Sequence, residues 1–289
     1  MNMSSPQETT SQTKKLSNFK VAAVQMASGT KVEGNLNEAR RHIEQAAQQG
    51  AKLVVLPEFF AIMGKNEMDK VNVREVDGSG AIQGFLSDMA KLYKIWLVGG
   101  SMPMATDSPN KVRNSCLVFN DLGERVARYD KIHLFNLDLG NERYHEGATI
   151  EAGDQVVVID TPFGRIGLAI CYDLRFPELF RAMKNVDIIV LPSAFTATTG
   201  KLHWQPLIRA RAIENLAYVI AAAQGGYHVN GRETHGHTMV VDPWGRILDE
   251  LQRGSGVVVA EINPTYQASL RASLPALSHR IIACGGETQ

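Results

Sequence analysis

Cysteine is scarce in this sequence, and its distribution limits the classes of protein that remain open. Three cysteines, Cys116, Cys171 and Cys284, are spread over 289 residues. Their odd number and the lack of a Cys-x-x-Cys pair argue against a disulfide framework and against a thiolate metal site. We therefore expect a protein of the reducing cytoplasm whose cysteines are free thiols.

The sequence also lacks an excess of charge and any long apolar run. The 30 Lys and Arg residues balance 30 Asp and Glu residues, so nothing favours a polyanionic partner such as nucleic acid. The longest apolar stretch, near residues 216–223, is far shorter than the roughly 20 residues that cross a bilayer. With 44% hydrophobic and 21% charged residues, the composition indicates a globular protein that binds neither nucleic acid nor membrane.

Internal repeats, low-complexity linkers and shifts in composition are absent after residue 18. Residues 1–18 are rich in Ser, Thr and Gln and contain no apolar signal core, so we expect a disordered tail. We expect a single domain over residues 19–282 and a short C-terminal tail over residues 283–289.

Strand and helix patterns alternate along the expected domain. Asn35, followed by Glu38 three residues later, predicts a helix start, and this helix should end at Gly50. Further helices are predicted at residues 82–92, 176–183, 202–214 and 264–272. Strands are predicted at residues 19–25, 53–56, 95–99, 115–120, 124–128, 156–160, 165–170, 187–191, 217–223, 237–241, 246–249 and 257–261. These strands are too many for one flat sheet, which favours an α/β architecture of two packed sheets with helices outside.

Three reactive side chains, Glu58, Lys131 and Cys171, follow predicted strands. Side chains at the ends of parallel strands converge on one crevice. There, the carboxylate could take the thiol proton, the ammonium could stabilise an oxyanion, and the thiolate could attack a carbonyl or nitrile carbon. Each residue alone has an ordinary interpretation as a surface charge or a small buried side chain. Their joint occurrence favours nucleophilic catalysis.

The local sequences around these residues resemble the three signatures of the nitrilase superfamily of carbon–nitrogen hydrolases. They are Leu-Pro-Glu-Phe at residues 56–59, Tyr-Asp-Lys-Ile-His-Leu-Phe at residues 129–135 and Gly-Leu-Ala-Ile-Cys-Tyr-Asp-Leu-Arg-Phe-Pro-Glu-Leu-Phe-Arg at residues 167–181. The resemblance extends from about residue 19 to residue 282 and implies a four-layer αββα sandwich with a Glu58–Lys131–Cys171 triad. It also implies a second active-site glutamate, for which Glu146 has the right place. A homodimer or larger homo-oligomer is implied as well, with residues 175–183 and 202–214 at the interface.

The second half of the chain is similar to the Nit branch of amidases, at residues 191–195, 199–204, 209–215 and 236–245. Residues 218–228 look most like the members that act on deaminated glutathione. The resemblance thus implies a thiol amidase for a small α-keto-acid amide, without a metal or an organic cofactor. An ω-amidase acting on α-ketoglutaramate is the alternative, and another amidase or N-carbamoyl amidase of the superfamily stays open. From a different class, His235 and His237 with His228 or His203 could bind a metal.

The resemblance and the local sequence together assign roles within the site. Glu58 is expected to accept the thiol proton, and Glu146 to position water. Lys131 and the backbone N–H of Tyr172 are expected to stabilise the oxyanion. The candidates for contact with substrate are Arg175 and Arg232, as partners for a carboxylate, and Phe60, Phe195 and Thr196 in the pocket wall. His133 is expected to position the loop that carries Lys131.

Overall fold

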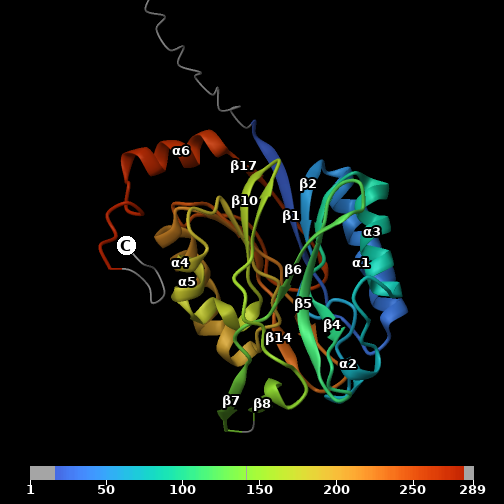
Figure 1. Cartoon of the computed structure of the whole chain (residues 1–289). Coiled ribbons are helices and arrows are strands. Elements are labelled where there is room, and N and C mark those ends of the chain that lie inside the picture. Colours follow the sequence, from blue (N-terminus) through green and yellow to red (C-terminus); the bar gives the residue numbers. More distant parts are fainter. Residues whose placement is uncertain (1–16, 141, 283–289) are drawn as a thin grey trace, which may run out of the picture.

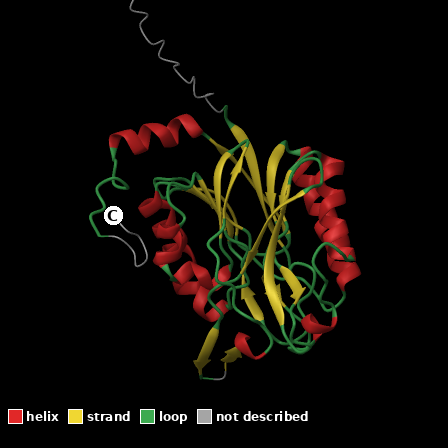
Figure 2. Ribbon diagram, viewed as in Figure 1, coloured by secondary structure: helices red, strands yellow, loops and turns green. Residues whose placement is uncertain are grey.

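The computed structural model describes residues 17–140 and 142–282, which form a helix–sheet–sheet–helix sandwich (Figures 1 and 2). The predicted α/β fold with an αββα arrangement is confirmed. The predicted tails fall mainly on residues 1–16 and 283–289, which lie outside the described residues, as does Cys284. No helix in the described ranges is long and apolar enough to cross a bilayer.

The first sheet contains seven strands, three of which run parallel to one another at its centre. Strands β1 (Phe19–Gln25), β2 (Ala51–Val55) and β3 (Trp96–Val98) are the parallel ones; the sequence, read as a β–α–β unit, predicts this for the first two. The order is β17 (Gly256–Ile262), β1 (Phe19–Gln25), β2 (Ala51–Val55), β3 (Trp96–Val98), β5 (Val112–Phe119) and β4 (Met102–Ala105), with β6 (Arg125–Asp130) also paired with β5.

The second sheet contains six strands, and its central three, β10, β11 and β12, are parallel. Its order is β16 (Ile247–Leu251), β15 (Thr238–Val241), β12 (Tyr218–Ala221), β11 (Ile188–Val190), β10 (Gly164–Leu168) and β9 (Val158–Thr161). Two separate hairpins complete the strands, β7 (Asn136–Leu139) with β8 (Glu142–His145) and β13 (Gly225–Tyr227) with β14 (Glu233–His235).

Side chains alternate between the two faces of each strand, so one face of a sheet packs against the other sheet and the opposite face packs against helices. In β1, Val21 and Ala23 belong to the core that includes the second sheet, whereas Ala22 and Val24 pack with the helices outside the first sheet. Those outer helices are α1 (Val32–Gln48) and α3 (Ala81–Tyr93). On the opposite side, α4 (Pro177–Ala182) and α5 (Ala197–Asn215) cover the second sheet (Figure 1). The short α2 (Asp69–Asn72) and the C-terminal α6 (Pro264–Ser273) lie outside these layers.

Two predicted helix starts are wrong. Helix α1 begins at Val32 after Lys31, so Asn35 lies inside the helix instead of capping it. The buried Asn35 amide bonds the N–H and C=O of Gly29 and the C=O of Ala61, so it satisfies polar groups of the neighbouring loops instead of the helix end. Helix α5 begins at Ala197, five residues before the predicted residue 202, because Thr196 caps it by accepting from the N–H of Thr199.

Candidate active site

Glu58 lies just beyond the carboxyl end of β2 and is buried, with 2% of its surface exposed. The adjacent Phe59 has φ of 52°, and its N–H donates to Ser101 Oγ at 3.0 Å, which holds this turn. The carbonyl of Glu58 accepts from Gln224 Nε2 at 3.1 Å, and one carboxylate oxygen accepts from Asn114 Nδ2 at 2.9 Å. The carboxylate therefore points from a rigid support into the interior.

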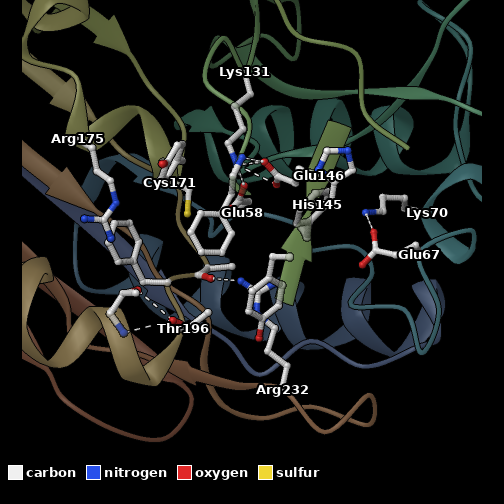
Figure 3. A pocket seen from close by; sticks show the side chains of 17 residues that line it. Glu58, Glu67, Lys70, Lys131, His145, Glu146, Cys171, Arg175, Thr196 and Arg232 are labelled. Carbon is white, nitrogen blue, oxygen red and sulfur yellow. Dashed lines mark hydrogen bonds and ion pairs between the residues drawn. The ribbon is translucent and has the colours of Figure 1, made fainter. Parts of the chain in front are cut away.

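Lys131 follows β6, and its ammonium group is the centre of the site. Nζ donates to Glu58 Oε1 and to both carboxylate oxygens of Glu146, each at 2.9 Å (Figure 3). Burial alone would lower the pKa of Lys131, but the negative charges of Glu146 and Glu58 outweigh it and raise the pKa above its usual value. The lysine is thus a fixed positive charge between two carboxylates.

Glu146 begins a short 3₁₀ helix, η1 (Glu146–Ala148), directly after β8. Besides the lysine contacts, its Oε2 accepts from the backbone N–H of Phe135 at 2.7 Å. The N–H of Glu146 in turn donates to the carbonyl of Phe135 at 3.1 Å. The hairpin β7–β8 that separates these two residues in sequence therefore returns Glu146 to the lysine loop.

Cys171 begins the 3₁₀ helix η2 (Cys171–Arg175) beyond β10. Its φ of 50° is in the left-handed region, which a non-glycine residue adopts at a cost of about 1–3 kcal/mol, while its N–H donates to Pro192 O at 2.9 Å. Burial and then the charge of Glu58 raise the pKa of the thiol, although Lys131 and a backbone hydrogen bond from Ala194 oppose them. The resting group is a neutral thiol beside a carboxylate.

Asp173, fully buried two residues after the cysteine, joins the cysteine turn to the lysine loop. Its Oδ2 accepts from Ile170 N–H at 2.8 Å and from Tyr129 OH at 2.7 Å. Its Oδ1 accepts from the His133 backbone N–H at 3.1 Å and lies 2.7 Å from His133 Nδ1. His133 thus holds the loop, as expected, and its ring stacks on Phe176 at 3.7 Å.

The predicted site residues line one pocket, which together with its mouth contains about 560 Å³ of space (Figure 3). Arg175 lies over the rings of Tyr172 and Phe195, with its guanidinium carbon 5.6 and 5.3 Å from their centroids, and Nη1 is 3.1 Å from His203 Nδ1. Thr196 lines the pocket and also caps α5. Phe60, predicted for the pocket wall, is instead fully buried in the core beside the outer helices of the first sheet and is not a lining residue. The lining residues are Glu58, Phe59, Glu67, Lys70, Lys131, Phe135, Tyr144, His145, Glu146, Cys171, Tyr172, Arg175, Ala194, Phe195, Thr196, Thr199 and Arg232.

Several of these residues were not predicted from the sequence. Asn114 supports Glu58 from β5, and the only signal is a polar residue within a buried strand. Lys70 and Glu67 form an ion pair at one side of the pocket. Their surroundings, an irregular polar stretch before a four-residue helix, carry no pattern that would place them near a cysteine 100 residues later.

The histidines proposed for a metal are engaged elsewhere. His228 places its two ring nitrogens 2.9 Å from Ser28 O and 2.8 Å from Thr234 Oγ1. His237 Nδ1 lies 2.6 Å from Glu250 Oε1, and the His235 ring stacks on the His237 ring. In residues 17–140 and 142–282, no group of three or more His, Cys, Asp or Glu side chains is placed to hold a metal ion.

Comparison with known proteins decides the family. The model of the family described as carbon–nitrogen hydrolase matches residues 20–272. This chain belongs to the carbon–nitrogen hydrolases. It is 43% identical over 270 residues to a deaminated glutathione amidase of Synechocystis, covering 91% of this chain and 98% of that protein. It is 36% identical over 271 residues to the ω-amidase Nit3 of Saccharomyces cerevisiae, covering 91% and 93%.

Structural comparison agrees with this assignment to the carbon–nitrogen hydrolases. A crystal structure of Saccharomyces cerevisiae Nit3, described as a member of branch 10 of the nitrilase superfamily, superimposes with a TM-score of 0.83 at 33% identity. The match covers 92% of this chain and 97% of that one. The chain is therefore an enzyme of the amidase type, and the predicted resemblance to the Nit branch is confirmed.

Proposed function

We propose that this carbon–nitrogen hydrolase is a thiol amidase that cleaves deaminated glutathione to α-ketoglutarate and cysteinylglycine. The observation that carries the proposal is the cluster of the buried Glu58 and Lys131 with the partly buried Glu146 beside Cys171, in a pocket that two arginines also line. The Synechocystis relative named for this activity supports the choice of substrate.

The acylation step begins with proton transfer from the Cys171 thiol to Glu58 as the sulfur attacks the amide carbon. The carbonyl π electrons move to oxygen, and the resulting oxyanion is stabilised by Lys131 and the N–H of Tyr172, each worth about 3–4 kcal/mol. In the described residues, no protein acceptor is found for this N–H. Glu58 then gives its proton to the leaving nitrogen, the C–N bond breaks, and a thioester remains on the cysteine.

In the deacylation step, a water molecule replaces the amine product. Glu58 removes a proton from this water, and the oxygen attacks the thioester carbon. Glu146, whose carboxylate shares the lysine with Glu58, is placed to orient the water. When the tetrahedral intermediate collapses, the C–S bond breaks, the sulfur regains its proton from Glu58, and the acid leaves. Every proton moves between groups of this chain, substrate and water.

Arg175 is the partner that we propose for the carboxylate of the α-keto-acid part. It ends the same 3₁₀ helix that Cys171 begins, so the guanidinium is held one short turn from the sulfur. Phe195 and Thr196 line the pocket as well, and we propose that they contact the acyl chain. A charged hydrogen bond here would orient the acyl chain toward the thiol.

Hydrolysis of α-ketoglutaramate is the second candidate. The 36% identity to a yeast ω-amidase over 91% of this chain favours it, and the substrate shares the α-keto-acid part for which Arg175 is placed. The two candidates differ in the leaving group, which is ammonia in one case and a dipeptide in the other.

The deciding experiment compares both amides with the purified full chain and follows α-ketoglutarate release. We expect a higher kcat/KM for deaminated glutathione. A higher value for α-ketoglutaramate would identify an ω-amidase, and hydrolysis of neither would overturn the proposed function. Cys171→Ala serves as the blank.

We also propose that the protein forms a homodimer or larger homo-oligomer through the face of α4 and α5. Large apolar side chains are exposed on and near this face, where Leu202 is 71%, Ile213 47% and Trp244 47% exposed. Light scattering should report at least twice the 31.7 kDa chain mass. Leu202→Glu should shift the population toward monomer, and an unchanged mass would argue against this face.

The cytoplasm is the compartment that we propose, because Cys116 and Cys171 are both free and buried. Fractionation of cells that produce the full chain should recover it with cytoplasmic markers, and recovery with another compartment would overturn this assignment.

A further inference from the structure

Two of the pocket's cationic side chains lack an acidic partner among the residues that the structure describes. Lys131 is paired with Glu58 and Glu146, and Lys70 with Glu67. Arg175 and Arg232, in contrast, contact aromatic rings, a histidine and a backbone carbonyl, but no carboxylate of the described residues. Unpaired guanidinium groups in a pocket favour a ligand with its own negative charges.

Arg232 is the arginine that the proposed mechanism does not use. Its Nη2 donates to Ala194 O at 2.6 Å, and its guanidinium carbon lies 5.0 Å from the centroid of the Tyr144 ring. Its Nε is buried and has no hydrogen-bond partner among the described residues. A buried donor of a charged group costs free energy when it is unpaired, so the hydrogen-bonding capacity of this guanidinium, which lines the pocket, is not fully used by the described residues.

The backbone around Arg232 is well anchored. In the turn between β13 and β14, the His228 N–H donates to the carbonyl of Arg232 at 2.9 Å, and the N–H of Arg232 donates to Asn230 Oδ1 at 3.0 Å. The following His235 N–H donates to Phe195 O at 2.9 Å, which ties the hairpin to the pocket wall. The guanidinium is therefore held in place before a ligand arrives, which lowers the entropy cost of binding.

The two arginines enter the pocket from different elements (Figure 3). Arg175 shares η2 with Cys171, and its guanidinium lies over Tyr172 and Phe195. Arg232 lies instead against Tyr144, whose neighbours in sequence, His145 and Glu146, line the pocket as well. A substrate cleaved at Cys171 with its acyl carboxylate at Arg175 would direct the remainder of its chain away from η2, toward the wall that carries Arg232.

We propose that Arg232 forms a carboxylate subsite for the leaving group, so that the enzyme selects amides whose nitrogen belongs to a short peptide-like chain ending in a carboxylate. This inference rests on the proposed function and extends it. The subsite distinguishes a dipeptide leaving group from ammonia, because only the dipeptide brings a second carboxylate into the pocket.

The test varies the substrate first, because a change at Arg232 also disturbs Ala194, whose backbone bonds the Cys171 sulfur. The kcat/KM of the wild-type chain is measured with deaminated glutathione and with the same molecule carrying a C-terminal carboxamide. Losing a charged hydrogen bond should lower kcat/KM by about 10- to 100-fold, mostly through a higher KM. Equal values for the two substrates would overturn the inference but leave the proposed function standing. Hydrolysis of neither would overturn both.

Variants of Arg232 then test whether this residue causes the difference in kcat/KM between the two substrates. In Arg232→Gln, the ratio of kcat/KM between the two substrates should fall toward one, whereas Arg232→Lys should keep part of it because the charge remains. The matched control is Arg253→Gln, an exposed arginine outside the pocket, which should keep the wild-type ratio. If Arg232→Gln does not fold, the Arg232→Lys ratio decides. An unchanged ratio in a folded Arg232 variant would overturn the assignment.

Discussion

At the level of single residues, the site is organised around one ammonium group. Lys131 holds Glu58 and Glu146 by three hydrogen bonds of 2.9 Å and is itself almost fully buried. Each carboxylate has a further donor, Asn114 for Glu58 and the backbone of Phe135 for Glu146. Because every partner is fixed before substrate binds, the charges need little reorganisation during the reaction.

The first prediction concerns the nucleophile and the ammonium. Cys171→Ala should lower kcat below detection, since no other thiol of the described residues lines the pocket. Lys131→Arg should lower kcat by about 100-fold or more, because a planar guanidinium cannot occupy the position of a compact ammonium between two carboxylates. Steady-state assays at saturating substrate check both changes. Cys116→Ala, a buried change in β5 away from the pocket, is the control and should retain turnover. Substantial activity in Cys171→Ala would contradict the mechanism.

The second prediction concerns the protonation of the thiol. Burial and the negative charge of Glu58 both raise the pKa of Cys171. In Glu58→Gln the charge is absent, so the pKa should fall and the thiolate should form at a lower pH than in the wild type. The rate of alkylation by iodoacetamide, measured against pH, gives the midpoint directly. A midpoint in Glu58→Gln equal to or above that of the wild type would show that the glutamate does not act on the sulfur.

At the level of elements, the site depends on how two loops are joined. The cysteine turn follows β10 of one sheet, whereas the lysine loop follows β6 of the other. Asp173 connects them by four contacts to Ile170, Tyr129 and His133. Burial and then the charge of Asp173 raise the pKa of Tyr129, so its hydroxyl stays a donor to this carboxylate.

The third prediction follows from this connection. Asp173→Asn replaces an acceptor by an amide donor beside the Ile170 N–H and the Tyr129 hydroxyl, so the two loops should separate slightly. We expect kcat to fall about 10- to 100-fold with KM little changed, and the free energy of unfolding to fall by about 1–3 kcal/mol. Kinetics and urea denaturation measure the two effects. Asp160→Asn, at a 92% exposed carboxylate in the second sheet, is the control. If Asp173→Asn and Asp160→Asn lose the same kcat and the same free energy of unfolding, the contacts of Asp173 between the two loops do not support catalysis.

At the level of the whole molecule, folding buries histidine side chains whose ordinary pKa of 6.5 is close to neutral pH. Burial lowers the pKa of His228, and burial together with the positive charge of His237 lowers the pKa of His235 to about 4. Both histidines lie on or beside the hairpin β13–β14, which also carries Arg232. The neutral forms are therefore the ones that the folded state accommodates.

The fourth prediction is a loss of stability in acid. Because the folded pKa values lie below the ordinary value of 6.5, the unfolded chain takes up protons first as the pH falls. The contribution of these histidines to the free energy of unfolding is fully present above about pH 6.5. For His235 it is lost progressively as the pH falls to about 4. Thermal melts between pH 7 and 4 should show a smaller decrease in Tm for His235→Gln than for the wild type. His279→Gln, at an exposed position, should follow the wild type; if all three decrease alike, His235 is not responsible.

Much of the fold and of the site followed from local patterns. The strands at residues 19–25 and 187–191, the β–α–β unit and the position of Cys116 in a buried strand all reflect hydrophobic alternation and turn residues. The hairpin strands β7, β8, β13 and β14 were not predicted, because they lie outside the sandwich and lack an alternating apolar face. Asn35 was misassigned because the capping pattern cannot reveal that tertiary contacts with Gly29 and Ala61 use its amide instead.

The sequence by itself determined the α/β class, the three strand ends with Glu58, Lys131 and Cys171, and the amidase family, because these depend on residue type and local order. Only the tertiary structure decided that Asn114 supports Glu58, that Asp173 joins the loops, and that Arg175 and Arg232 have no acidic partner among the described residues. The contacts behind these facts join residues that lie 28 to 56 positions apart in the chain. Such contacts arise when two sheets pack and hairpins close over their edge, and no local pattern encodes them.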